Sequence, residues 1–167
     1  MTHRRTEQEV FLEQEVFLEQ GGLYCSRKPS LIRTVLGSCV AVCLLDRGGR
    51  AGGMNHYVLP ECPDANPSPR YGNVAIARLI RGMNRIGCPN DALQAKIFGG
   101  AAVLPYGVAE ETVGCRNIAI AEATLRDLGI PITARCTGGE AGMIIHLHTA
   151  SGEVLVRSVP QYAYAAE

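Results

Sequence analysis

A continuous apolar run at residues 39–45 is the feature that most constrains the fold of this chain. It lies between Gly37-Ser38 and a turn-forming stretch, Asp-Arg-Gly-Gly-Arg, at 46–50. Its length and composition are typical of a strand buried on both faces, although periodicity alone also allows a buried helix. Residues 51–59 are expected to return as a second strand, because such turn sequences join hairpins.

The remaining chain alternates short apolar runs with Gly- and Pro-rich turns. Helical spacing predicts one helix over 73–86, with Asn73 as N-cap and Gly87 beyond its end. A second helix is expected from Asn117 as N-cap, with positions 118, 121, 125 and 128 facing inward. Further strands are expected at 16–18, 23–26, 31–36, 95–98, 132–136, 143–148 and 153–157. This pattern predicts an α+β fold, a mixed or antiparallel β-sheet sandwich layered with two main helices.

A tandem repeat, Glu-Gln-Glu-Val-Phe-Leu, occupies residues 7–18. Two copies are too few for a solenoid, which needs at least three stacked units. We interpret the repeat as a local duplication whose second copy enters the fold. We therefore expect a flexible extension at 1–15, a single domain at 16–160 and a tail at 161–167, which suits a chain of 167 residues.

Charge and hydropathy exclude two classes of partner. Sixteen basic residues balance sixteen acidic ones, whereas nucleic-acid binding usually needs a basic surplus. No apolar run approaches the roughly 20 residues that span a bilayer. The first residues turn acidic without the apolar core of a signal peptide. We expect a cytoplasmic protein with no nucleic-acid partner and no membrane insertion.

Seven cysteines are many for this length, but their number is odd and no Cys-x-x-Cys occurs. A reducing compartment disfavours a disulfide scaffold, and the spacing gives little support to a zinc site. Most of the cysteines should be small buried hydrophobes. His146 and His148 share one face of an alternating strand. A solvated face is the plain interpretation of this pair; a metal pair is the alternative, for which no third ligand is evident.

Cys39 and His56 are the two residues that could act together in catalysis. Pairing residue 45 with residue 51 across the turn would place Cys39 diagonally beside His56 at the open end of the hairpin. A thiol beside an imidazole is the minimum equipment for nucleophilic acyl chemistry. On spacing alone this is a weak signal, because scattered cysteines are common.

Longer runs carry a resemblance that strengthens this interpretation. Leu-Gly-Ser-Cys ends at Cys39, and Met-Asn-His ends at His56. Together with 34–46, 53–60, 95–101, 114–117, 137–139 and 149–157, these runs resemble the CheD family of chemoreceptor glutamine deamidases. The likeness covers residues 16–159.

The resemblance implies a Cys-His hydrolase related to toxin deamidases, with Cys39 as nucleophile and His56 as base. A threonine before the cysteine completes the site in the family. Some members have it six positions before the cysteine, where this chain has Arg33; Thr34 lies five before, and a bulge would bring it into place. No metal or organic cofactor is implied.

The implied substrate is a glutamine in the cytoplasmic helices of chemoreceptors, and glutamyl methyl esters present the same acyl geometry. Backbone amides at Ser38 or Cys39 would stabilise the oxyanion. A CheC-like chemotaxis phosphatase is an implied further partner, and we expect a monomer. The alternative is a non-catalytic adaptor that binds chemoreceptors or such a phosphatase. Thiol reactivity separates the two, since an activated Cys39 would alkylate well below about pH 8.5.

Overall fold

The apolar run forms the central strand β4 (Val40–Asp46) of the structure, a computed structural model that describes residues 13–49, 51–103 and 112–160. Six of its seven residues are buried. Successive side chains of a strand point to opposite faces of the sheet. Val40, Val42 and Leu44 accordingly join one hydrophobic cluster, and Ala41, Cys43 and Leu45 join another. The prediction of a strand buried on both faces is confirmed.

Two open, mixed sheets hold the nine strands of the described residues. Their bounds are β1 (Gln14–Phe17), β2 (Leu23–Ser26), β3 (Ser30–Leu36), β4, β5 (Gly52–Asn55), β6 (Leu93–Gly99), β7 (Ile132–Thr137), β8 (Gly142–His148) and β9 (Val154–Val159). The first sheet has the order β1-β3-β8-β9, with β1 parallel to β3. The second has the order β2-β5-β4-β6-β7, with β6 parallel to β7. The other neighbours are antiparallel.

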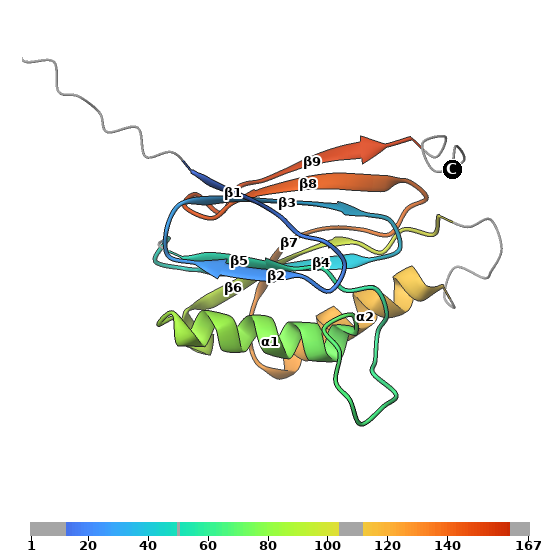
Figure 1. The fold of residues 1–167 in the computed structure, drawn as a ribbon, viewed down its shortest axis with the longest axis horizontal. Helices are drawn as coiled ribbons and strands as arrows, with labels where there is room; N and C mark the ends of the chain where they lie inside the picture. Colours follow the sequence, from blue (N-terminus) through green and yellow to red (C-terminus); the bar gives the residue numbers. More distant parts are fainter. Residues whose placement is uncertain (1–12, 50, 104–111, 161–167) are drawn as a thin grey trace, which may run out of the picture.

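The sheets and helices form three layers (Figure 1). The sheet that contains β4 lies in the middle, the other sheet covers one of its faces, and helices α1 (Gly72–Arg85) and α2 (Val113–Asp127) cover the other. A short 3-10 helix, η1 (Asn90–Ala92), leads into β6. One hydrophobic cluster lies between the helices and the middle sheet, and the second lies between the two sheets. The predicted α+β sandwich with two main helices is therefore confirmed.

Strand boundaries fall within two residues of those predicted, except that β5 ends at Asn55 instead of continuing to 59. The second copy of the repeat supplies β1, and the first copy lies outside the described residues. None of the described helices combines the length and the apolar content that crossing a bilayer requires.

Both predicted helix starts need correction. The N-cap of α1 is Tyr71, and the side chain of Asn73 instead accepts a hydrogen bond from the Cys62 amide. Helix α2 begins four residues before Asn117, with Thr112 as its N-cap. Asn117 is buried inside the helix, whereas Leu128, predicted to face inward, is 45% exposed. Gly87, with a φ of 93°, follows α1 as predicted.

The end of β6 fixes the backbone on which Cys39 lies. Gly99 has a φ of +100°, and a Cβ atom at this position would overlap the carbonyl oxygen of Cys39. The amide of Gly100 donates to the same carbonyl oxygen at 2.9 Å. Only glycine permits this close approach together with a left-handed backbone.

Gly99→Ala is therefore expected to lower the free energy of unfolding by about 2–5 kcal/mol, because a left-handed backbone costs alanine about 1–2 kcal/mol and steric overlap adds about 1–3. Gly139→Ala is the matched control, since Gly139 has a φ of +71° and its added Cβ would meet nothing within 4 Å. Chemical denaturation measures both losses. Equal losses would contradict the contact with Cys39.

Candidate active site

The hairpin of β4 and β5 pairs in a register one residue away from the predicted one. Leu45 lies opposite Gly52, and Val40 lies opposite Tyr57. The shift arises because Asp46 belongs to the strand, where its amide donates to the carbonyl of Ala51 at 3.0 Å. The turn is consequently one residue shorter than its sequence suggests.

This one-residue shift decides whether the two candidate residues can meet. Residues directly opposite each other point to the same face, and a slip of one residue reverses the face. In the predicted register, Cys39 and His56 would have pointed to opposite faces. In the observed register, Cys39 lies opposite Val58 and diagonal to His56, and such diagonal neighbours are roughly 7–8 Å apart at Cα and within reach of long side chains. The structure therefore brings both side chains to the face between the two sheets.

Asn55 opens the hairpin beside His56. Its side-chain oxygen accepts the amide of Val42 at 2.8 Å, in place of a backbone carbonyl. The amide of His56 instead donates to the carbonyl of Gly22, the residue that precedes β2, at 3.1 Å. His56 thus lies where β5 parts from β4, and the ring is only 4% exposed.

Thr34 holds His56 from the opposite sheet. Its Oγ1 lies 2.7 Å from His56 Nδ1 and 2.7 Å from the carbonyl oxygen of Leu18. No bulge is needed, because the register of β3 runs unbroken from Leu31 to Leu36 and strand alternation turns Thr34 inward. Arg33 lies on the other face, half-buried. Thr34 rather than position 33 therefore meets the imidazole.

The donor and acceptor roles in this chain of bonds fix the tautomer of His56. The single hydroxyl proton of Thr34 goes to the Leu18 carbonyl, which accepts only, so Oγ1 accepts the proton on Nδ1. The other nitrogen, Nε2, then carries the lone pair. Nε2 is buried and has no hydrogen-bond partner among the described residues. An oriented imidazole with a free Nε2 is the form that a general base requires.

Cys39 lies directly before β4 and is 8% exposed. Its carbonyl is held by Gly100, and the carbonyl of Gly37 accepts the amide of Ala101 at 2.9 Å. In the described part of the chain, the amides of Ser38 and Cys39 donate to no oxygen atom, and the Cys39 amide interacts with its own sulfur. Two N–H groups beside a thiol, neither bound to an oxygen, are suited to form an oxyanion hole.

Burial keeps both candidate groups neutral. It raises the pKa of the Cys39 thiol above its ordinary value, against the smaller lowering effects of its own backbone amide and the Arg70 guanidinium. Burial also lowers the pKa of His56 to about 4, against the opposing effect of the Leu18 carbonyl. The raised pKa of Cys39 does not favour a thiol that is ionised at rest, so the expected alkylation well below about pH 8.5 stays a prediction for experiment. The resting pair is a thiol and a neutral imidazole.

Asn117 is the residue of the site that the sequence did not indicate. Its side-chain amide donates to the carbonyls of Ser38 and Val58, both at 2.9 Å, and its backbone carbonyl accepts the hydroxyl of Tyr57 at 2.5 Å. Val40 and Tyr57 form the last ladder pair before the two strands diverge. Asn117 therefore bridges the strands just where Cys39 lies, and it is fully buried.

The other residues considered from the sequence lie apart from this arrangement. Cys43 shares the face of Cys39 but is fully buried, which raises its pKa to about 12. His146 and His148 are half-buried on β8, and His148 Nδ1 lies 3.0 Å from a carboxylate oxygen of Glu13. No group of three potential metal ligands occurs among the described residues. All seven cysteines are free thiols.

A buried thiol before β4, an imidazole after β5 and a hydroxyl on β3 of the other sheet form a set of groups suited to nucleophilic acyl chemistry. Comparison with known proteins places the chain more narrowly. The family described as CheD chemotactic sensory transduction matches residues 58–158, a segment that begins after Cys39 and His56.

Full-length relatives extend this match. The chain is 55% identical to the probable chemoreceptor glutamine deamidase CheD of Rhodospirillum rubrum, over 83% of this chain and 79% of the relative. Proteins of the same name from Sulfurimonas denitrificans and Caulobacter sp. are 44% and 42% identical, over 82% and 84% of this chain and 89% and 75% of the relatives. The chain belongs to the CheD family.

The burial of neutral His56 predicts a loss of stability in acid. The pKa of His56 in the folded protein is lower than the ordinary value of about 6.5, so the unfolded chain binds a proton at His56 more tightly than the folded protein does. The contribution of neutral His56 to the free energy of unfolding is complete above about pH 6.5 and is lost as the pH falls towards 4. Between pH 7 and 4.5, wild type should lose about 2–3 kcal/mol more unfolding free energy than His56→Gln, which has no ring to protonate. Urea denaturation at both pH values checks this, and equal acid losses would contradict it.

Proposed function

We propose that this protein converts glutamine side chains of methyl-accepting chemoreceptors to glutamate. The observation that carries the proposal is the chain of bonds from the Leu18 carbonyl through Thr34 to His56, which leaves Nε2 free on the face that Cys39 shares. The relatives named as probable chemoreceptor glutamine deamidases supply the substrate class. The catalytic roles of Cys39, His56 and Thr34 are part of this proposal.

In the first half of the reaction, His56 Nε2 takes the thiol proton while the sulfur of Cys39 attacks the side-chain amide carbon of the substrate. Attack from a neutral thiol fits the raised pKa of Cys39 and the lowered pKa of His56. A carbon–sulfur bond forms and the carbonyl oxygen becomes an oxyanion. The amides of Ser38 and Cys39 are the donors available to it.

The tetrahedral intermediate collapses when the imidazolium returns its proton to the leaving nitrogen and ammonia departs. The Thr34 hydroxyl and the Leu18 carbonyl stabilise the transient imidazolium through Nδ1–H. Water then attacks the thioester with Nε2 of His56 again as base, which releases glutamate and restores the thiol. Water is the only co-reactant, so the reaction requires no cofactor.

Several finer points belong to the same proposal. A glutamyl methyl ester offers the same acyl carbon, with methanol in place of ammonia, so methylated receptors are a second class of substrate. The Cys-His chemistry relates the enzyme to toxin deamidases. We propose that it acts in the cytoplasm as a single-domain monomer.

A non-catalytic adaptor that binds receptors or a CheC-like phosphatase is the alternative function, but binding alone has no need of a buried base with a free Nε2.

Mass spectrometry of a receptor cytoplasmic domain tests the function. We expect glutamine-to-glutamate conversion, a gain of about one mass unit per site, with wild type and none with Cys39→Ala, because the nucleophile is removed. Conversion by both proteins would keep the activity and remove Cys39 from it. Receptor binding without conversion by either would favour the adaptor.

Thr34→Val tests the support of the base. Valine matches threonine in shape but lacks the hydroxyl, so Nδ1 loses its acceptor and the tautomer is no longer fixed. We expect kcat to fall by about 10²-fold, within the range that general base catalysis supplies, with little change in KM. Thr34→Ser keeps the hydroxyl and should retain most of the activity. Equal losses in the two variants would show that packing, not the hydroxyl, matters at this position.

A further inference from the structure

Helix α1 carries three arginines and no acidic residue in its 14 positions. Arg78, Arg81 and Arg85 are spaced by three and four residues, so they lie on one side of the helix. All three are exposed, and none takes part in an ion pair within the described residues. We call this set the arginine ridge.

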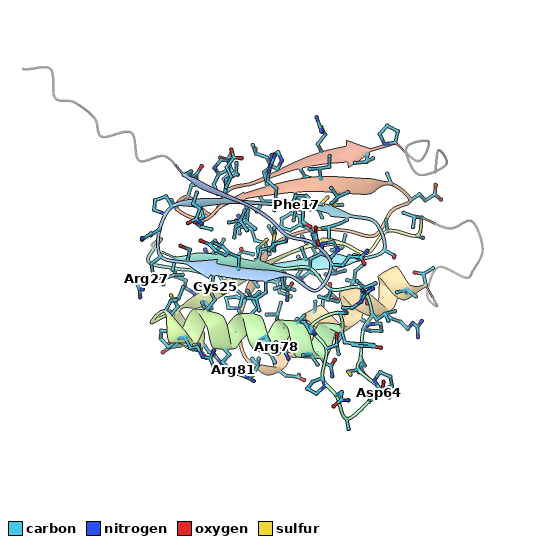
Figure 2. All side chains as sticks on the ribbon, in the orientation of Figure 1. Phe17, Cys25, Arg27, Asp64, Arg78 and Arg81 are labelled. Atoms are coloured by element: carbon cyan, nitrogen blue, oxygen red, sulfur yellow. The ribbon has the colours of Figure 1, made fainter. Side chains whose placement is uncertain are left out.

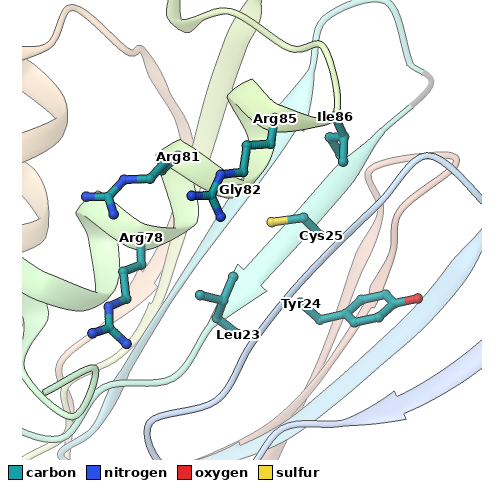
Figure 3. A pocket seen from close by; sticks show the side chains of 8 residues that line it. All are labelled: Leu23, Tyr24, Cys25, Arg78, Arg81, Gly82, Arg85 and Ile86. Carbon is teal, nitrogen blue, oxygen red and sulfur yellow. The ribbon is translucent and has the colours of Figure 1, made fainter.

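The arginine ridge borders a surface hollow of about 590 Å³. Leu23, Tyr24 and Cys25 of strand β2 line the opposite wall (Figure 3). Figure 3 shows the three guanidinium groups extending from helix α1, and Figure 2 places Arg78 and Arg81 on this helix. The hollow therefore has a cationic wall and a largely apolar wall.

The ridge is unfavourable in the isolated chain. Like charges spaced three or four residues apart on a helix repel each other. The chain has sixteen acidic residues that could offset the repulsion, yet none pairs with the ridge in the described part of the structure. The Arg78 guanidinium donates to the carbonyl of Pro67 at 3.5 Å, but none of the three pairs with a carboxylate of the described residues. Such guanidiniums beside a hollow are suited to carboxylates supplied by another molecule.

One end of this hollow lies close to the candidate active site. Leu23 pairs with Asn55, and the carbonyl of Gly22 accepts the amide of His56. Leu23 packs towards the helices, whereas His56 faces the other sheet. Strand β2 is the edge strand of the middle sheet and pairs with β5, the strand that His56 directly follows.

We propose that the arginine ridge is a docking surface for an acidic helix of the substrate protein, outside the catalytic site. Arg78 to Arg85 spans seven residues, or roughly 10 Å of helix, which a partner helix matches with carboxylates at the same spacing. The zero net charge of the chain argues against nucleic acid as the occupant. This inference rests on the proposed function, since it assigns the docking site for the same substrate.

The test compares Arg78→Gln/Arg81→Gln/Arg85→Gln with a control of equal charge change, Arg47→Gln/Arg126→Gln/Arg157→Gln, whose three arginines are also exposed. Deamidation is measured on the receptor cytoplasmic domain and on a short glutamine peptide without acidic residues. We expect the ridge variant to raise KM for the receptor about tenfold, the effect of three modest charge pairs, with kcat unchanged. The peptide reaction and the control should match wild type, and added salt should reduce the difference.

A receptor KM unchanged by the ridge substitutions, or raised equally by the control, would overturn the docking proposal. An equal loss on the peptide would also overturn it, because the effect would then arise at the catalytic site. Receptor binding by Cys39→Ala, with and without the ridge substitutions, separates this proposal from the proposed activity. If wild type deamidates nothing, but the ridge substitutions abolish receptor binding by Cys39→Ala, the docking surface stands and the proposed activity is rejected. Competition by single-stranded DNA but not by polyglutamate would assign the ridge to nucleic acid and reject the proposal.

Discussion

The hydrogen bond between Thr34 and His56 is the interaction on which the candidate site depends. It joins a strand of one sheet to a residue at the edge of a hairpin in the other, at 2.7 Å in a buried setting. A buried polar group without a partner costs free energy, so the bond and the close packing of the two sheets support each other. The Leu18 carbonyl completes the arrangement by taking the hydroxyl proton. The base is thereby oriented by groups that are far apart in the sequence.

The position of the Cys39 thiol depends on a second set of contacts, which fix the backbone around Cys39 and not its side chain. Gly100 and Ala101 fix the loop before β4, and Gly99 permits the close approach. Asn117 bridges the two diverging strands from helix α2. Sheet, loop and helix thus meet at Cys39, which explains how a residue outside regular structure keeps a defined position. In the proposed reaction, the burial of two neutral groups requires that the thiol proton is transferred as the sulfur attacks.

Sequence patterns predicted most of the fold, because the apolar runs and glycine turns here match strands and helices closely. The family motifs indicated Cys39, His56 and Thr34, and the structure brings Thr34 to His56. The hairpin register could not be predicted, since Asp46 has the composition of a turn residue but pairs within the strand. Asn117 was mistaken for a helix cap because hydrophobic periodicity cannot distinguish a buried amide with tertiary partners from one at a helix end.

The Leu18 carbonyl belongs to the residue directly after β1, a four-residue edge strand whose only strand neighbour in the described part of the chain is β3, in parallel. Short edge strands open more readily than central ones, and such local opening does not require the domain to unfold. When β1 detaches, the hydroxyl of Thr34 loses its acceptor and is free to donate to His56 instead, which favours the opposite tautomer. Under the proposed mechanism, detachment of the N-terminal strand would therefore lower the activity, and heating would reduce the activity at temperatures below those that unfold the domain.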